Sequence, residues 1–281
     1  MAIKITSDST CDLPRALLEE HDVTIFPLTV IKDGKPYRDG LEIAPADIFR
    51  HVEAGGEITT TAAVSVGEYQ EAFRRLSARY EAVIHIDISA DFSSCYQNAC
   101  IAAEEFGNVY VVDSRNLSSG HGHVVVEAAL AAEAGMEARD IVSYLEGLTP
   151  RVEASFIIDR LDYMVKGGRC SAVAMLGANL LKLKPCIEVA GGRMGVVKKY
   201  RGSFEKCLND YVKDRLQGRD DLDLGRIFIT YSSAPAQAVE AVRQAIARYA
   251  DFEQIIETRA GCTVSSHCGP NTLGILFIRS R

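Results

Sequence analysis

The sequence has little of what nucleic-acid-binding and membrane-spanning proteins require. It carries a net charge of −7 and has no block of basic residues. This argues against nucleic acid as the main partner, because such binding needs clustered Lys and Arg. The apolar stretch of residues 170–181, which holds no charged side chain, is only twelve residues long. A membrane-spanning helix needs about twenty residues, so we expect no stable membrane insertion.

Cysteine pairs and nucleotide-binding motifs are missing as well. The eight cysteines include no CxxC pair and no zinc-like spacing, and the first residues do not resemble a signal peptide. We therefore expect reduced thiols in a cytoplasmic protein, with packing as their default role. A P-loop and a GxGxxG motif are absent, so nothing in the sequence indicates that this chain itself binds ATP. We predict no cofactor and no metal site.

The first half of the chain repeats one pattern. At 281 residues the chain is longer than one typical core, so two domains are expected. In residues 1–150, apolar runs typical of strands alternate with polar loops and helices. This repetition predicts an α/β domain in which helices cover both faces of a parallel sheet. The first strand is expected to stop at Ile5, before the polar residues 6–10.

The second half, residues 151–281, has a different pattern. A hairpin over 184–199 that turns at Gly191-Gly192 is followed by alternating helices and strands, which predicts an α+β domain with a mixed or antiparallel sheet. Residues 171–181 are expected to form a helix that is nonpolar all round, and such a helix needs apolar surroundings on every side. Those surroundings are either protein core or a long apolar ligand, and periodicity does not separate the two.

Two hydroxyl groups are predicted to lie near the starts of neighbouring helices. Ser93 comes at the start of a helix expected over 94–106, and Thr61 lies in a loop before the preceding helix. Unpaired amides at a helix start favour a negative group, so the pair can hold a carboxylate or a phosphate; each is otherwise an ordinary cap. Arg169, directly after Gly167-Gly168, can aim a guanidinium at such a site.

Other residues support rival sites. Asp8 and Asp113 each follow a predicted strand, so they would gather at the carboxyl edge of the sheet, where a sugar or phosphate ligand could bind. A nucleophilic Ser93 or Ser266 is the other alternative. The histidines that could activate it are His85, His121, His123 and His267. No GxSxG elbow accompanies either serine, and a lone His in a tight loop, as expected for His267, is more often structural.

Taken together, several segments resemble the DegV family of bacterial fatty-acid-binding proteins over nearly the whole chain. Any one of them is a weak signal, but their order and spacing are specific. The segments are Ile5 to Thr10, Ile88 to Ala99, Val112 to Ser114, Leu161 to Ser171, Lys184-Pro185, and His267 with Gly269-Pro270.

The resemblance implies a binding protein that is not an enzyme. Such a protein encloses one long-chain fatty acid and presents its carboxyl group to a separate ATP-dependent fatty acid kinase, which makes the acyl phosphate. The resemblance assigns carboxyl binding to Thr61 and Ser93, and the rest of the polar network to Arg169 and His267. Arg201 would lie on the kinase-facing surface. An esterase or acyltransferase that uses Ser93 and His267 remains the alternative function.

The expected tunnel is lined across both halves of the chain. The tunnel residues are Phe156, Ile158, Met175 and Leu176. The sequence departs from the family pattern twice, with Ser93-Ser94-Cys95 in place of Ser-Gly-Thr, and with 62–65 in place of Ser-Gln-Pro-Ser. Both departures lie beside the loops that are expected to hold the head group.

Overall fold

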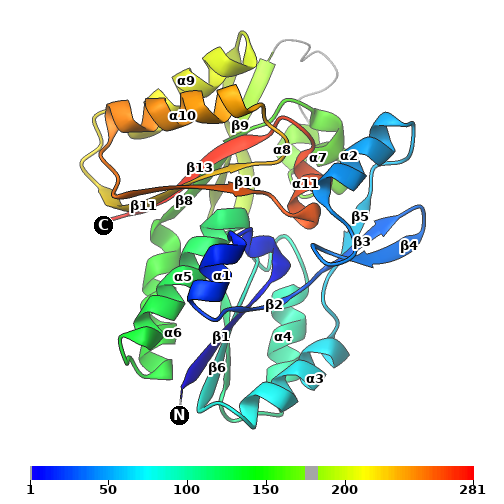
Figure 1. Cartoon of the computed structure of the whole chain (residues 1–281), viewed down its shortest axis with the longest axis vertical. Coiled ribbons are helices and arrows are strands. Elements are labelled where there is room, and N and C mark those ends of the chain that lie inside the picture. The colour runs from blue at the N-terminus through cyan, green and yellow to red at the C-terminus, as the bar shows by residue number, and fades with distance from the viewer. Residues whose placement is uncertain (1, 175–182) are drawn as a thin grey trace.

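Two main sheets lie one above the other in the computed structural model, which describes residues 2–174 and 183–281 (Figure 1). The lower sheet is parallel, with strand order β2-β1-β6-β7. Its strands are β1 (Ile3–Asp8), β2 (Thr24–Phe26), β6 (Ala82–Asp87) and β7 (Val109–Asp113). Apolar residues dominate β6, and all six of its residues are buried, as expected for a central strand covered on both faces.

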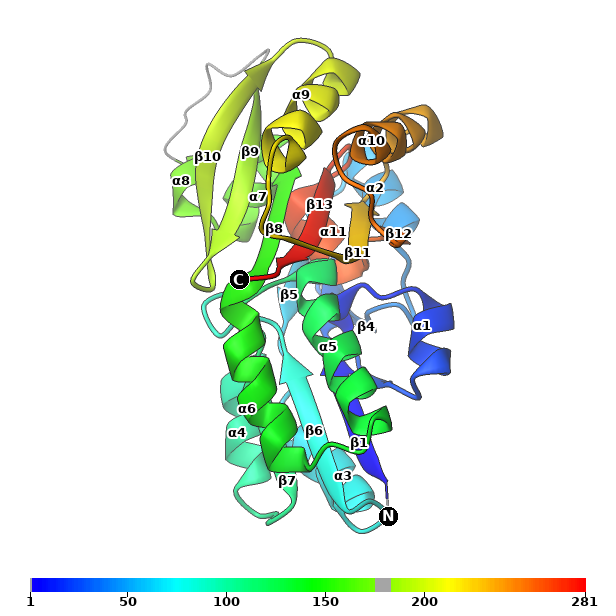
Figure 2. The same ribbon diagram turned by 90° about the vertical axis from the view of Figure 1, so that its left-hand side faces the viewer.

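Helices cover both faces of this parallel sheet (Figure 2). One face carries α3 (Val66–Ser77) and α4 (Cys95–Ala103), and the other carries α5 (Ser118–Glu133) and α6 (Ala138–Leu148). Helix α1 (Arg15–Glu20) follows a short 3-10 turn after β1. The predicted α/β architecture of the first half is therefore confirmed.

A small antiparallel sheet projects to one side of the parallel sheet (Figure 1). It contains β3 (Thr29–Lys32), β4 (Lys35–Arg38) and β5 (Thr60–Ala62), with α2 (Pro45–Glu53) between β4 and β5 in the chain. The sequence indicates the β3–β4 hairpin through its Asp33-Gly34 turn, but it gives no sign of the third strand. Thr61 therefore lies on strand β5, and the expectation of a loop there was wrong, because β3 offers a free edge with which residues 60–62 pair.

The upper sheet is mixed, as predicted for the second half. Its strand order is β10-β9-β8-β13-β11-β12, and all pairs are antiparallel except β11 with β12. Its strands are β8 (Val152–Ile157), β9 (Leu183–Ala190), β10 (Arg193–Arg201), β11 (Leu222–Tyr231), β12 (Gln254–Arg259) and β13 (Leu273–Arg279). Its helices are α7 (Leu161–Gly167), α8 (Ser171–Ala174), α9 (Phe204–Leu216), α10 (Ala236–Tyr249) and α11 (Cys262–Cys268).

The two halves share one hydrophobic cluster. It contains Ile84 and Val124 from the first half together with Phe156 and Leu276 from the second, and α5 contacts strands of both large sheets. The domain boundary near residue 150 stays a prediction. None of the helices in the described parts of the chain is both long and apolar enough to cross a membrane.

The first strand is longer than the sequence indicated. β1 continues past Ile5 to Asp8, and Thr6 and Ser7 are fully buried within it. Thr6 Oγ1 lies 2.9 Å from His85 Nδ1, and Ser7 Oγ lies 3.0 Å from His121 Nε2. Buried polar groups are tolerated when they are hydrogen-bonded, so the polar composition of residues 6–8 did not end the strand.

Of the helix expected over 171–181, the described residues contain only α8, which covers Ser171–Ala174. Met175 and Leu176, two of the four expected tunnel residues, lie outside the described residues.

Candidate functional site

A pocket of about 60 Å³ brings together the four polar residues proposed for the head group. Thr61 comes from β5, Ser93 from the loop before α4, Arg169 from the link between α7 and α8, and His267 from α11. The rest of the lining is mainly apolar. It consists of Leu28, Ala63, Ile88, Phe92, Leu117, Met194, Thr263, Val264 and Cys268.

His267 is the polar residue at the centre of this pocket. Its Nε2 lies 2.8 Å from Thr61 Oγ1, within hydrogen-bond distance, while its Nδ1 is buried without a partner in the described structure. Burial, and to a lesser degree the positive charge of Arg169, lower the pKa of His267 to about 4. The imidazole is therefore neutral at pH 7, and it serves this pocket as a hydrogen-bonding group without a charge.

The helix that carries His267 was expected to be a tight loop. That expectation was wrong, because side-chain oxygens of Asp12 and Asp39 accept from the amino-terminal amides of α11. Asp12 Oδ1 accepts from Gly261 N at 2.7 Å, and the two oxygens of Asp39 accept from Cys262 N at 2.8 Å and Thr263 N at 3.0 Å. Burial raises the pKa of Asp12 to about 8. These long-range caps stabilise a short helix that its Ser, Thr and Cys content does not favour.

Arg169 supplies the positive charge of the pocket. Its Nη1 donates to Gly167 O at 2.7 Å and its Nε to Phe92 O at 3.3 Å, and it forms no ion pair with any described carboxylate. The two positions before Arg169 require glycine for different reasons. Gly168 has φ +67° and ends α7, whereas a Cβ at Gly167 would lie 2.3 Å from His267 Nδ1.

Ser93 is held close to the start of α4. Its Oγ accepts from Cys95 N and donates to Cys95 Sγ, both at 3.2 Å. The tip of the β9–β10 hairpin fixes the same loop, because Ser89 Oγ donates to Gly192 O at 2.8 Å and Arg193 Nε lies 3.0 Å from Asp91 Oδ1. The second half of the chain thereby positions a hydroxyl of the first half.

A second cavity, of about 20 Å³, adjoins the first. The two share Leu117, Val264 and Cys268, which form a wall between them that we call the shared wall. Phe156, one of the expected tunnel residues, lines this second cavity, whereas Ile158 is fully buried and lines neither cavity. Both spaces hold only a few water-sized groups, so a longer ligand has to separate the apolar side chains around them.

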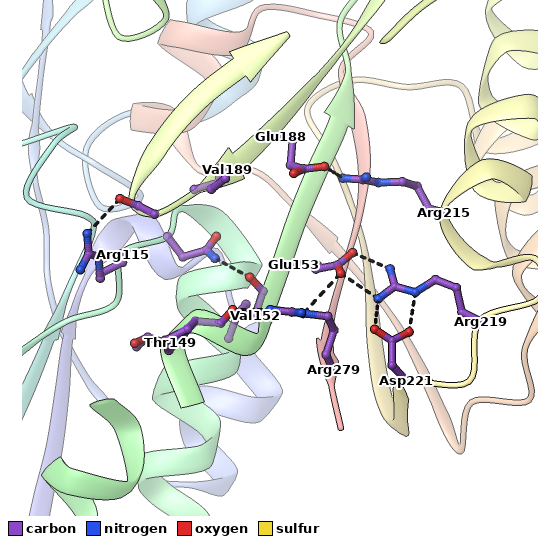
Figure 3. Close-up of a pocket in the computed structure, with 14 residues that line it drawn as sticks. Arg115, Thr149, Val152, Glu153, Glu188, Val189, Arg215, Arg219, Asp221 and Arg279 are labelled. Carbon is purple, nitrogen blue, oxygen red and sulfur yellow. Dashed lines mark hydrogen bonds and ion pairs between the residues drawn. The ribbon is translucent and has the colours of Figure 1, made fainter. Parts of the chain in front are cut away.

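A larger cleft, of about 640 Å³, lies elsewhere and is lined by charged residues (Figure 3). Arg219 binds Glu153 through two contacts of 2.8 Å and also binds Asp221, while Arg215 pairs with Glu188. These two guanidinium groups are already matched by carboxylates, whereas Arg115, in the same cleft, donates to Gly191 O. The lining of the cleft includes Glu153, Glu188 and Asp221, and the lining of the smaller pocket includes no acidic residue among the described residues. The smaller pocket is therefore the better candidate for an anionic ligand.

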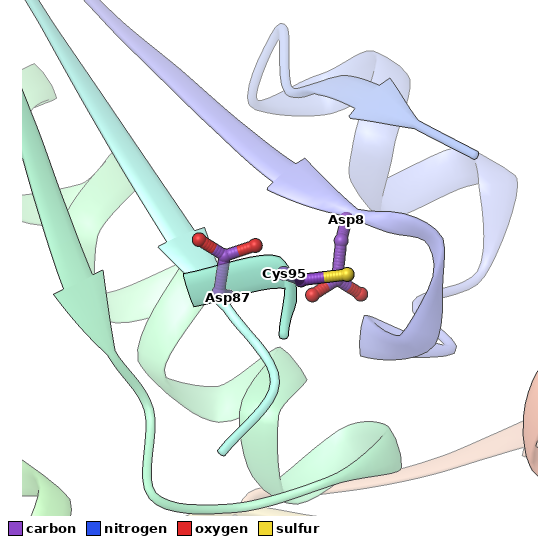
Figure 4. Close-up of side chains that lie close together, drawn as sticks. All are labelled: Asp8, Asp87 and Cys95. Atoms are coloured by element: carbon purple, nitrogen blue, oxygen red, sulfur yellow. The ribbon is translucent and has the colours of Figure 1, made fainter. Parts of the chain in front are cut away.

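Of the two acidic residues considered for a sugar or phosphate ligand, Asp8 is buried and Asp113 is half-buried. Asp8 is fully buried, and its oxygens accept from Thr10 N and Ile88 N, each at 2.7 Å. Its neighbours are Asp87 and Cys95, which offer possible ligand atoms within 4.8 Å of one another and of Asp8 (Figure 4). The half-buried Asp113 accepts from Arg115 N at 2.8 Å. Both Asp8 and Asp113 thus hold backbone amides at strand ends.

The rival serine nucleophile lacks its base. In the described parts of the chain, no hydrogen bond joins Ser93 to His267, and no carboxylate contacts His267 Nδ1. Ser266 is buried and donates to Cys262 O at 2.8 Å. A nucleophilic serine needs a hydrogen-bonded base that a third group orients, so this arrangement is not that of a Ser-His pair.

Arg201 lies apart from the pocket. It is an exposed residue at the end of β10, which is an edge strand of the upper sheet. Met194, which lines the pocket, lies seven residues earlier on the same strand. At about 3.3 Å per residue, the two positions are roughly 23 Å apart along the strand.

Sequence reasoning missed most of the apolar lining and one hydroxyl. Leu117, Met194 and Val264 carry no polar signal, and nothing in the sequence distinguishes them from ordinary core residues. Thr263 was also missed. It lies four residues before His267, so a helix prediction for residues 262–268 would have placed both on one face.

Comparison with known proteins gives a consistent family assignment. A family model described as an uncharacterised protein of the DegV family matches residues 2–280. A DegV domain-containing protein from Caldanaerobacter subterraneus is 30% identical over 279 residues, which are 98% of this chain and 98% of that protein.

Solved structures of similar proteins have the same fold over their full length. A DegV family protein from Thermus thermophilus, described by its fatty acid binding, is 31% identical with a TM-score of 0.91, and the match covers 99% of this chain and 100% of that one. A stearic-acid-binding protein from Eubacterium ventriosum is 25% identical with a TM-score of 0.83, and the match covers 99% and 98%.

Proposed function

The chain belongs to the DegV family, and we propose that it binds one long-chain fatty acid inside the molecule. The carboxylate lies in the pocket of Thr61, Ser93, Arg169 and His267, and the acyl chain extends past the shared wall. One observation carries the proposal: a cation without an acidic partner among the described residues and three hydrogen-bonding side chains line one end of an interior whose remaining lining surface is mainly apolar. Relatives described as fatty-acid-binding proteins support it.

The polar end fits a carboxylate in particular. An ionised carboxylate accepts about four hydrogen bonds, and here it meets the Arg169 guanidinium, the hydroxyls of Thr61 and Ser93, and a neutral His267. Because the pKa of His267 is lowered to about 4, its charge does not change in the physiological range. Recognition of the head group therefore rests on one cation and on hydrogen bonds.

Burial of the acyl chain supplies most of the affinity. Each buried methylene is worth ~0.8 kcal/mol, so a chain of about fourteen gives on the order of 11 kcal/mol before ordering costs. A charge-assisted hydrogen bond adds only about 1.5 to 3 kcal/mol. The tail thus sets how tightly the ligand is held, and the polar end sets which way it points.

The bound acid is the substrate of another protein. We infer that an ATP-dependent fatty acid kinase docks on this chain, that a carboxylate oxygen takes the γ-phosphoryl group of ATP, and that ADP leaves. The absence of a P-loop and of GxGxxG in this sequence is in keeping with an ATP site on the partner. Arg201 is the proposed docking residue, because it is exposed on an edge strand that also reaches the pocket through Met194.

Native mass spectrometry of the purified protein tests the binding function. We expect a complex heavier than the chain by the mass of one fatty acid, from which organic solvent extracts the acid. After delipidation, the protein should take up one equivalent of hexadecanoic acid. A chain that leaves the cell without lipid and takes none up after delipidation would contradict the proposal.

An esterase or acyltransferase remains the second candidate, because Ser93 and His267 line the same pocket. Turnover of a chromogenic acyl ester that Ser93→Ala abolishes would favour it. We expect no such turnover, since Ser93 Oγ is engaged with Cys95 and His267 with Thr61.

A further inference from the structure

Thr263 adds a hydroxyl to the proposed head-group pocket that no other described residue engages. Its side chain is only 5% exposed, and it lines the same pocket as Thr61 and His267. Its Oγ1 is buried and has no hydrogen-bond partner in the described structure. The hydroxyls of Thr61 and Ser93, in contrast, each have a partner within the protein.

An unpaired buried hydroxyl is uncommon and calls for a physical reason. A threonine in a helix often bonds a backbone carbonyl one turn earlier, which would satisfy Oγ1. Thr263 occupies the first turn of α11, so no helical turn precedes it and its hydroxyl stays available. The backbone N–H of Thr263 donates to Asp39 Oδ2 at 3.0 Å, and this bond holds the residue in place.

The position of Thr263 on α11 directs it to the head group. Residues four apart lie on one face of a helix, with Cβ atoms about 5–6 Å apart, so Thr263 and His267 face the same space. His267 reaches Thr61 across that space, and both residues line the pocket with Ser93 and Arg169. Because Thr61 and His267 are hydrogen-bonded to each other, they offer only one donor between them to a carboxylate. The carboxylate therefore has acceptor capacity left for the hydroxyl of Thr263.

We propose that Thr263 Oγ1 donates a hydrogen bond to the fatty-acid carboxylate, as a third hydroxyl beside Thr61 and Ser93. The inference rests on the proposed function and assigns a further residue to its site. It also accounts for the unpaired hydroxyl, because that hydroxyl gains its partner only when the ligand is bound.

The test compares Thr263→Val and Thr263→Ser with the wild-type protein after delipidation. Affinity is measured for hexadecanoic acid and for its methyl ester, which has the same chain without the charge. Thr263→Val should weaken acid binding about tenfold, the effect of one lost charge-assisted hydrogen bond, and ester binding at least threefold less than that. Thr263→Ser should bind the acid nearly as the wild type does.

Thermal unfolding of the ligand-free proteins gives a second readout. Because the wild-type hydroxyl is unpaired, its removal in Thr263→Val should leave the melting temperature unchanged or raise it. Thr272→Val is the matched control, since Thr272 lines the neighbouring cavity but already donates to Cys268 O at 2.9 Å. Thr272→Val should not distinguish the acid from the ester. If Thr263→Val does not fold, Thr263→Ala removes the same hydroxyl with less steric demand.

Each outcome decides a separate point. Unchanged acid binding by Thr263→Val, or an equal loss for acid and ester, overturns the assignment of Thr263 and leaves the fatty-acid-binding function intact. A wild-type protein that binds neither ligand overturns the proposed function together with this inference.

Discussion

The two ends of the proposed binding interior are built in different ways. The polar end takes its side chains from segments that are distant in sequence, since Thr61 and His267 lie 206 positions apart. The apolar end is walled by Leu117, Phe156 and Leu276, which belong to the hydrophobic cluster shared by both halves. Directional hydrogen bonds fix the first end and close packing fixes the second, so the two ends can serve orientation and affinity separately.

The supports of the two ends differ in kind as well. Side-chain oxygens of Asp12 and Asp39 hold the helix that carries His267, and a hairpin tip holds the loop that carries Ser93. The shared wall needs no such supports, because apolar side chains pack without directional partners. We therefore expect pH and hydroxyl removal to act on the polar end, and side-chain volume to act on the apolar end.

The largest effect should come from closing the apolar end. Val264 is half-buried and belongs to the shared wall between the two cavities. Val264→Trp would therefore fill the space through which an acyl chain has to pass this wall. If six methylenes lose their place, hexadecanoic acid loses about 5 kcal/mol of binding free energy, at ~0.8 kcal/mol each. Octanoic acid, which does not need the second cavity, should lose much less. Competition binding with the two acids measures the difference.

Val264→Ala is the control for this variant, because it enlarges the passage and should preserve binding of the long acid. Equal losses for the long and the short acid in Val264→Trp would mean that the acyl chain does not pass the shared wall.

The polar end should respond to pH through Asp12. Burial raises the folded-state pKa of Asp12 from 3.8 to about 8, so the carboxyl is protonated in the folded protein at pH 5. Its contribution to stability is fully present below pH 3.8 and is lost as the pH rises through 8. Between pH 5 and pH 7 this loss amounts to about 3 kcal/mol, at 1.36 kcal/mol per unit.

Asp12→Asn isolates this contribution, because the amide resembles the protonated acid and can still accept from Gly261 N. Urea unfolding at several pH values should give a flatter profile for Asp12→Asn than for the wild type. Parallel profiles would show that Asp12 ionises in the folded protein much as it does in the unfolded chain.

The contrast between local signals and long-range contacts explains which parts of the fold the sequence could predict. Apolar runs and glycine turns are local signals, so the parallel sheet and the hairpin at Gly191-Gly192 were predicted correctly. Helix α11 was missed because its capping carboxylate, Asp39, lies 223 positions before Cys262. The end of β1 was missed for the same reason, since the partners of Thr6 and Ser7 are distant histidines.

The residues of the candidate site also differ in whether the sequence could predict them. Thr61 and Ser93 were named from their places before predicted helices, and Arg169 from the two glycines that precede it. The family resemblance added His267 and assigned all four to the head group, and the fold brings them into one pocket. The shared wall had no signal at all, because an apolar residue that lines a cavity looks like any core residue in a sequence. Only the packing of α5 and α11 against the sheets identifies it.

Loss of one head-group hydroxyl should have a smaller effect on binding than closing the tunnel. Ser93→Ala should weaken the free energy of fatty acid binding by about 1.5 kcal/mol, while slowing acyl phosphate formation by the kinase at least about tenfold, because the carboxylate is no longer aimed. Native mass spectrometry measures the retained lipid, and a reconstituted assay measures the product. Ser94→Ala is the control, since exposed Ser94 makes no side-chain capping bond. Complete loss of lipid from Ser93→Ala would contradict the division between the two ends.

The smallest effect on binding should come from Arg201, which belongs to neither end. It lies roughly 23 Å along β10 from Met194, so Arg201→Glu should leave fatty acid affinity and the unfolding free energy unchanged. Reversing one charge at the rim of a docking surface mainly slows association, so the rate of acyl phosphate formation at limiting kinase should fall by about three- to tenfold. Lys199→Glu, at an exposed position two residues earlier on the strand, shows whether the effect is local to Arg201 or follows the general charge of the edge. An unchanged rate for Arg201→Glu, with lipid still bound, would remove Arg201 from the docking surface.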